Sequence, residues 1–162
     1  MLGSTVEPVV LQTGDWAFVI ENLDYLAGGL RLTIELTILS IVLGFIAGFP
    51  AGAVEVYGTR VWKTPVRVLG TILRGTPLVV ILIFAFFVFP IGSAFMAAIL
   101  GLGLRSAAYQ SQIFRGALAS VDEGQLEAAR AVGMSQFQAI RHVIVPQALR
   151  RSMPGFQNEF TI

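Results

Sequence analysis

The sequence predicts an all-α integral membrane protein, with three transmembrane helices followed by a cytoplasmic helix-turn-helix segment. Of its 162 residues, 55% are hydrophobic and only 13% are charged, and the mean hydropathy is +0.75. A soluble domain of this size needs more charge to cover its surface. The absence of cysteine and the single histidine exclude disulfides, thiolate metal sites and multi-histidine sites. The net charge of +1 gives no reason to expect nucleic acid as a partner.

The first transmembrane helix is predicted over residues 30–54. Between Glu35 and Glu55 the chain has 19 uncharged residues in succession. At about 1.5 Å per residue they extend roughly 28 Å, close to the hydrocarbon thickness of a bilayer.

The second and third helices are predicted over residues 66–89 and 93–115. The 30 residues between Arg74 and Arg105 carry no charge, which is too long for one helix. The sequence PIGS at 90–93 supplies a break between the two. Arg74 is then expected near the membrane interface.

The distribution of basic residues predicts the orientation. Residues 1–27 hold four acidic residues and no basic one, whereas the segments after the first and third helices are rich in arginine. The positive-inside rule therefore makes residues 1–27 an extracytoplasmic tail and puts residues 120–146 in the cytoplasm. The tail has no basic n-region and no compact apolar run, so a cleavable signal peptide is not expected here.

Residues 120–146 are predicted to form two short helices joined by a glycine turn. Ser120 with Glu123, or Asp122 with Gln125, fits a capping box, and Ser135 with Gln138 fits a second one. Gly133 is placed to end the first helix in a left-handed conformation, and Pro146 marks an end or a kink. From these features alone, docking to a protein and lying flat on the bilayer remain equally open.

A spaced motif in this segment points to a family. Glu127-Ala128-Ala129, then Gly133, then Val143-Ile144-Val145-Pro146 resembles the EAA loop of the permease subunits of bacterial-type ABC importers, with matching spacing throughout. Val143 and Val145 replace the usual isoleucine and leucine.

Further stretches resemble the polar amino acid permeases within that family, which have a MetI-like transmembrane fold. Arg74-Gly75-Thr76-Pro77-Leu78 matches their RGTPL signature. Ala107-Ala108-Tyr109 and Pro146-Gln147-Ala148-Leu149-Arg150 match stretches on either side of their EAA loop. The resemblance covers about residues 28–160. One departure is Gln112, where the family commonly has glutamate.

The resemblance implies a transport subunit with several partners and no catalytic residues of its own. It implies a second permease subunit, identical or different, cytoplasmic ATPase subunits, an extracytoplasmic substrate-binding protein and an amino acid substrate. The EAA loop, through Glu127, Ala128, Ala129, Gly133 and Pro146, is expected to dock the ATPase. Because the sequence has no G-x-x-x-x-G-K-[ST] loop, ATP is expected to be bound by a partner subunit, and no cofactor by this chain.

Arg105 is the candidate substrate-path residue. It lies ten residues before Arg115, so it is about 15 Å deeper along a continuous helix, where a charge must face protein or water. With Tyr109 and Gln112 it is a candidate to line the translocation cavity and meet a substrate carboxylate. An ion pair with Glu35 or another acid explains the same residue equally well.

Three glycines of the first helix form a side-chain-free face. Gly44, Gly48 and Gly52 recur every four residues, so another helix can approach closely. Plain helix packing is favoured over a sliding contact used in transport.

Members of the resembled family continue with two further spans after the EAA loop. The expectation from this resemblance is an incomplete bundle over residues 28–162, which leaves a transport-incompetent permease fragment that still docks the ATPase as the alternative function.

Overall fold

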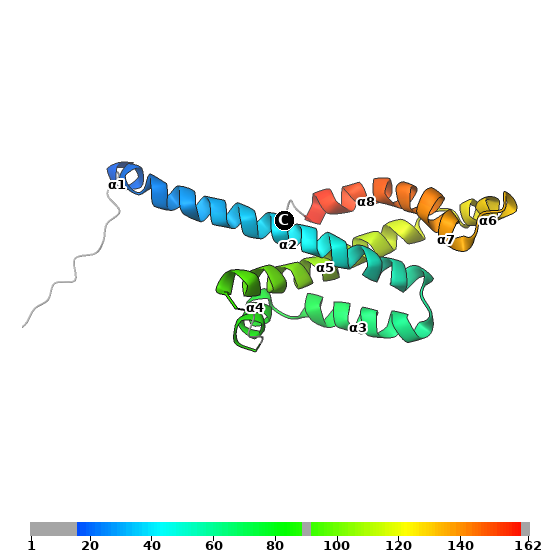
Figure 1. Ribbon diagram of the computed structural model, residues 1–162, viewed down its shortest axis with the longest axis horizontal. Helices are drawn as coiled ribbons and strands as arrows, with labels where there is room; N and C mark the ends of the chain where they lie inside the picture. Colours follow the sequence, from blue (N-terminus) through cyan, green and yellow to red (C-terminus); the bar gives the residue numbers. More distant parts are fainter. Residues whose placement is uncertain (1–15, 89–91, 160–162) are drawn as a thin grey trace, which may run out of the picture. The chain divides into compact units, whose positions relative to one another are not determined.

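The computed structural model describes residues 16–88 and 92–159, which form helices joined by short turns, with no strand among them (Figure 1). The chain divides into two compact units, residues 1–35 and 36–162. The first holds α1 (Trp16–Glu21) and the start of α2 (Leu23–Tyr57). The second holds the rest of α2, then α3 (Arg60–Gly75), α4 (Leu78–Phe87) and α5 (Ala94–Ala119). It ends with α6 (Glu123–Ala131), α7 (Gln136–Ala139), a π-helical turn (Ile140–Ile144) and α8 (Val145–Glu159).

The all-α prediction is confirmed, and the predicted first and third helices are present. Residues 30–54 lie inside α2, which is long and apolar enough to cross a membrane. Residues 93–115 correspond to α5, which begins one residue later, with Ser93 as its cap, and continues to Ala119. Part of the expected turn at 90–93, and residues 1–15 of the expected tail, lie outside the described residues. The number of membrane crossings stays a prediction.

The prediction of one continuous helix over 66–89 is wrong. The chain forms α3 and α4 instead, and the helix axis bends by 107° between them. Pro77 lacks the N–H that a continuing helix would use, and its ring pushes the preceding residue out of the helical region. Thr76 accordingly has φ −83° and ψ 132°. The apolar run continues through this point, but the helix does not.

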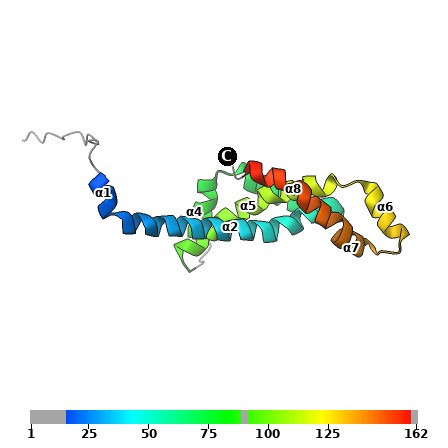
Figure 2. The same ribbon diagram turned by 90° about the horizontal axis from the view of Figure 1, so that it is seen from above.

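Helix α5 packs against α3, α4 and α8, and Figure 2 shows α8 beside α5. Its Phe114 is 1% exposed. The ring centroid of Phe114 lies 5.1 Å from that of Phe45, 5.2 Å from that of Phe49 and 5.2 Å from that of Phe156. These edge-to-face contacts join α2, α5 and α8, so α5 positions both the helix break and the C-terminal helices.

Candidate functional sites

The RGTP stretch forms the junction between α3 and α4. The backbone N–H and the hydroxyl of Thr76 both donate to the Ile72 carbonyl, at 2.9 and 2.8 Å, and end α3. Pro77 is the N-cap of α4, at a position where a missing N–H costs no hydrogen bond within the helix. A Cβ added to Gly75 would meet no neighbouring atom within 4 Å. The stretch that resembles the RGTPL signature is therefore, in structural terms, a helix break.

Two arginines fasten this junction to α5 in opposite directions. Nη1 of Arg74, on α3, donates to the Ala108 carbonyl of α5 at 2.9 Å. Nη1 of Arg105, on α5, donates to the Thr76 carbonyl at 2.6 Å. Charge-assisted bonds of this kind are stronger than neutral ones. The geometry of the junction is thus fixed by bonds from both sides.

Arg105 and Tyr109 lie together, as expected, but Gln112 lies elsewhere. The Arg105 guanidinium is 5.3 Å from the Tyr109 ring centroid, and its Nη2 donates to the Tyr109 hydroxyl at 3.4 Å. Glu35 pairs with Arg31 at 2.8 Å. Within the described ranges no carboxylate lies at ion-pair distance from Arg105. Its charge is met by a carbonyl and an aromatic ring.

Gln112 belongs to a polar network around Glu55, a residue that no sequence motif marks. The Glu55 side chain is 2% exposed. Gln112 Nε2 donates to Glu55 Oε1 at 2.7 Å, while Gln112 Oε1 accepts from Arg115 Nε at 2.8 Å. The Nε atoms of Arg67 and Arg115 lie 3.6 and 3.9 Å from Glu55 Oε2. The network ties α2, α3 and α5 together. Its only sequence signal is an acid that ends the apolar run of α2.

The three glycines of α2 face α5, as the packing interpretation predicts. A Cβ at Gly48 would lie 2.9 Å from the Ala107 carbonyl oxygen, and one at Gly52 would lie 2.7 Å from the Ser111 carbonyl oxygen. A Cβ at Gly44 would lie 2.5 Å from the Gln110 side chain. The sliding interpretation stays a prediction.

The segment after α5 is a helix-turn-helix whose capping follows the sequence signals closely. Asp122, rather than Ser120, caps α6 by accepting from the Gly124 N–H at 2.7 Å. Gly133 has φ +86°, the left-handed conformation that favours glycine. Ser135 and Gln138 form a complete capping box. Pro146 neither ends nor breaks the helical run, because the π-helical turn before it accommodates its missing N–H.

This unit has a buried base and an exposed tip. Its base is a core in which Leu118 and Ile144 are each 2% exposed, and Arg151 donates to the Ser120 carbonyl. At the tip, Val132 is 75% exposed and Phe137 is 70% exposed. Of the motif residues, Ala129 is buried, whereas Glu127, Ala128 and Gly133 are exposed. The helix-turn-helix therefore presents exposed apolar side chains on either side of Gly133.

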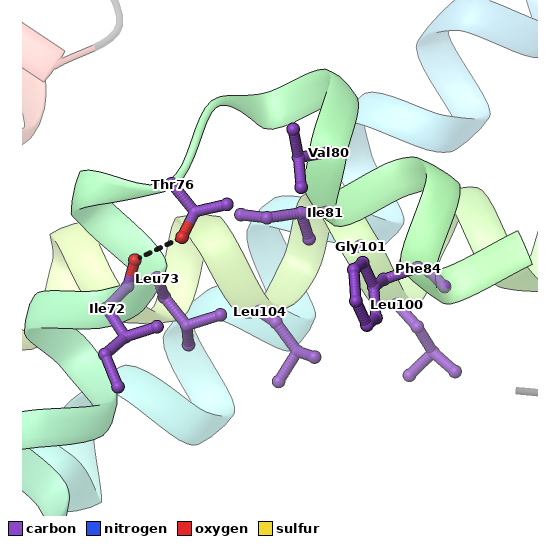
Figure 3. Close-up of a pocket in the computed structure, with 10 residues that line it drawn as sticks. Ile72, Leu73, Thr76, Val80, Ile81, Phe84, Leu100, Gly101 and Leu104 are labelled. Carbon is purple, nitrogen blue, oxygen red and sulfur yellow. Dashed lines mark hydrogen bonds between the residues drawn. The ribbon is translucent and has the colours of Figure 1, made fainter. Parts of the chain in front are cut away.

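An apolar cavity of about 530 Å³ lies in the angle between α3 and α4, beside α5 (Figure 3). Leu73, Phe84 and Leu104 are among the residues that line it. Thr76 supplies a hydroxyl, but this donates to the Ile72 carbonyl. The lining is mainly hydrocarbon, and its one hydroxyl can only accept a further hydrogen bond, so the cavity suits an apolar group better than a polar solute.

Comparisons with known proteins agree with this arrangement. Residues 40–162 match the family model of the binding-protein-dependent transport system inner membrane component. The chain is 37% identical over 157 residues to the probable amino-acid permease protein YxeN of Bacillus subtilis, covering 93% of this chain and 70% of that one. It is 32% identical over 154 residues to the glutamine transport system permease protein GlnP of Escherichia coli K12, covering 91% and 70%.

Two solved structures have the same fold. One, described as an amino acid ABC transporter with histidines, has a TM-score of 0.76 and 33% identity, covering 91% of this chain and 71% of that one. The other, the MetNI methionine ABC transporter in inward-facing conformations, has a TM-score of 0.71 and 25% identity, covering 82% and 66%. Fold and sites together define a membrane permease of the MetI-like class. The chain belongs to the family of binding-protein-dependent transport system inner membrane components.

Proposed function

We propose that this permease takes part in ATP-driven uptake of a polar amino acid, in which it forms part of the translocation path. The relatives YxeN and GlnP carry amino-acid and glutamine permease names, which supports this substrate class. The proposed partners are a second permease subunit, cytoplasmic ATPase subunits that bind the ATP, and an extracytoplasmic binding protein. The similarity to these permeases does not favour the alternative, a transport-incompetent fragment.

The exposed tip of the helix-turn-helix is the observation that carries the proposal. Val132 and Phe137 present apolar surface on either side of Gly133, while the base of the same unit is packed into α5 and α8. Because the base is packed against the other helices, a movement of the ATPase at the tip would be passed on to the transmembrane helices. A loose amphipathic linker would not couple the two movements. The ATPase is the proposed occupant, with residues 120–146 in the cytoplasm and the N-terminus outside.

The coupling experiment compares Phe137→Ser with Gln136→Ala in the reconstituted importer. Both side chains are exposed in the free chain, so neither change should impair folding or insertion. Loss of an apolar anchor at an interface costs about 2 kcal/mol or more, which is a loss of roughly 30-fold in affinity. Phe137→Ser should therefore strongly reduce solute-stimulated ATP hydrolysis and uptake, and Gln136→Ala should leave both near the wild-type level.

A second pair of variants changes the backbone conformation and the buried face of the helix-turn-helix. Gly133→Val forces a branched side chain into a left-handed backbone, and Ala129→Glu places a carboxylate at a buried position. Both should uncouple ATP hydrolysis from uptake while the protein still inserts. Normal coupling in Phe137→Ser and in these variants would refute the assignment of the docking surface.

Arg105 is the proposed substrate contact, with Tyr109 beside it. Its guanidinium is half-buried and is held by a carbonyl and a ring rather than by an acid, so a substrate carboxylate would be its first anionic partner among the described residues. Gln112 leaves this group, because it is committed to Glu55 and Arg115.

Arg105→Lys keeps the charge but loses the planar fork. Hydrogen bonds to a charged group contribute about 1.5–3 kcal/mol, so the apparent KM for uptake should rise roughly tenfold or more. Arg150→Lys, at an exposed position on α8, is the matched control. An unchanged KM and rate in Arg105→Lys would exclude the substrate role while leaving the docking surface untouched.

A further inference from the structure

We propose that a basic pocket between the end of α2 and the start of α3 binds the phosphate of an anionic phospholipid headgroup. The pocket has a volume of about 370 Å³. It is lined by one face of α3 together with the residue that follows α2, namely Gly58, Arg60, Lys63, Thr64, Arg67 and Val68. No part of the proposed transport cycle uses this pocket. Of the conclusions above, the inference needs only that the protein lies in a membrane.

The pocket carries more positive charge than its surroundings neutralise. Arg60, Lys63 and Arg67 are spaced i, i+3 and i+7, which puts them on one face of α3. The Arg60 guanidinium has no hydrogen-bond or ion-pair partner in the part of the chain that the structure describes. Lys63 Nζ donates to the Val56 carbonyl at 2.8 Å, so two of its three N–H groups remain.

The nearest counter-charge is already shared. Glu55 lies 3.6 Å from Arg67 and 3.9 Å from Arg115, and its side chain is 2% exposed. Among the described residues, this one buried carboxylate faces Arg67 and Arg115 and forms no ion pair with Arg60 or Lys63. An anion that enters the pocket meets three cations and no competing acid in the lining.

The position of the pocket along the chain favours a lipid over a free anion. The uncharged run of α2 ends at Val54, four residues before Gly58, so the pocket lies where the apolar region gives way to headgroups. In the same turn of α3, Val61 is 76% exposed and Trp62 is 67% exposed. An exposed indole beside cations is typical of the membrane interface. A phosphate ion would make no contact with the exposed apolar side chains of Val61 and Trp62, whereas the acyl chains of a phospholipid would cover them.

The test measures lipid retention by the purified protein. The protein in neutral detergent is titrated with phosphatidylglycerol or with phosphatidylcholine, and bound lipid is counted by native mass spectrometry. Each basic residue near a membrane surface contributes about 1 kcal/mol toward an anionic lipid, equivalent to about 5-fold in affinity. Wild type should therefore prefer phosphatidylglycerol. Arg60→Gln should weaken its retention about 5-fold, and the double variant Arg60→Gln with Arg67→Gln should weaken it about 25-fold.

The control removes the same charge elsewhere. Arg130→Gln with Arg141→Gln, both exposed in the helix-turn-helix, should retain phosphatidylglycerol as wild type does. Arg60→Gln alone keeps the test valid if loss of Arg67 disturbs the Glu55 network. Equal binding of the two lipids, equal loss in the control, or full displacement of phosphatidylglycerol by inorganic phosphate would each overturn the proposal.

Discussion

Single residues decide how closely the helices approach. Gly48 is a clear case, since a Cβ there would lie 2.9 Å from the carbonyl oxygen of Ala107, a backbone atom that cannot move aside. Gly116 offers the opposite case, with nothing within 4 Å of the same added carbon. Both are helical glycines, so the propensity gain on changing to alanine is the same. The difference between them isolates packing.

We expect Gly48→Ala to destabilise the protein and Gly116→Ala to leave it unchanged or slightly more stable. Overpacking costs about 1–3 kcal/mol, and relief of the glycine entropy gives back about 1 kcal/mol at most. Thermal unfolding in detergent, followed by circular dichroism, measures the difference. Equal midpoints for the two variants would show that α2 does not pack against α5 through this face.

Local backbone features, such as helix caps and glycine turns, are also the ones that can be predicted most directly from the sequence. Gly133, Ser135 and Gln138 act on backbone atoms a few positions away, so their motif alone predicts the left-handed turn and the capping box. The burial of Glu55 could not be predicted in this way. Its partner Gln112 is 57 positions away, and no local pattern states which long-range pairs meet.

At the scale of helices, the junction between α3 and α4 shows where hydropathy misleads. Uncharged, mainly apolar residues continue through positions 75–104, and hydropathy with a break at residues 90–93 predicts one helix over 66–89. Pro77 and the extended Thr76 break it, and the bonds from Arg74 and Arg105 to the backbone fix the break. Hydropathy indicates whether a segment lies in lipid or in water. The path of the backbone also depends on proline and on tertiary hydrogen bonds.

The Glu55 network is a second feature at the scale of helices, because it joins three of them. Gln112→Leu removes the donor 2.7 Å from a carboxylate whose side chain is 2% exposed. Loss of a hydrogen bond to such a buried charged group costs about 1.5–3 kcal/mol, although Arg67 and Arg115 remain near Glu55 Oε2. We expect a lower unfolding temperature in detergent for Gln112→Leu and no change for Gln136→Leu, which is exposed on α7. Matching unfolding temperatures would mean that the network contributes nothing to stability.

At the scale of the whole molecule, the N-terminus and the helix-turn-helix are proposed to face opposite sides of the membrane. Family membership and the MetI-like fold establish a membrane permease. Charge distribution supports an external N-terminus and a cytoplasmic helix-turn-helix. The chain has no cysteine, so one introduced thiol can be addressed alone without altering a background.

Site-directed cross-linking of the tip to the ATPase tests the central proposal most directly. Phe137→Cys, at a 70% exposed position of the tip, should form a cross-link to the ATPase subunit in membranes that contain both. Tyr25→Cys, at an 82% exposed position, should form none and should react with a membrane-impermeant maleimide from outside intact cells. If Phe137→Cys instead reacts from outside and never cross-links to the ATPase, the helix-turn-helix is not the docking element.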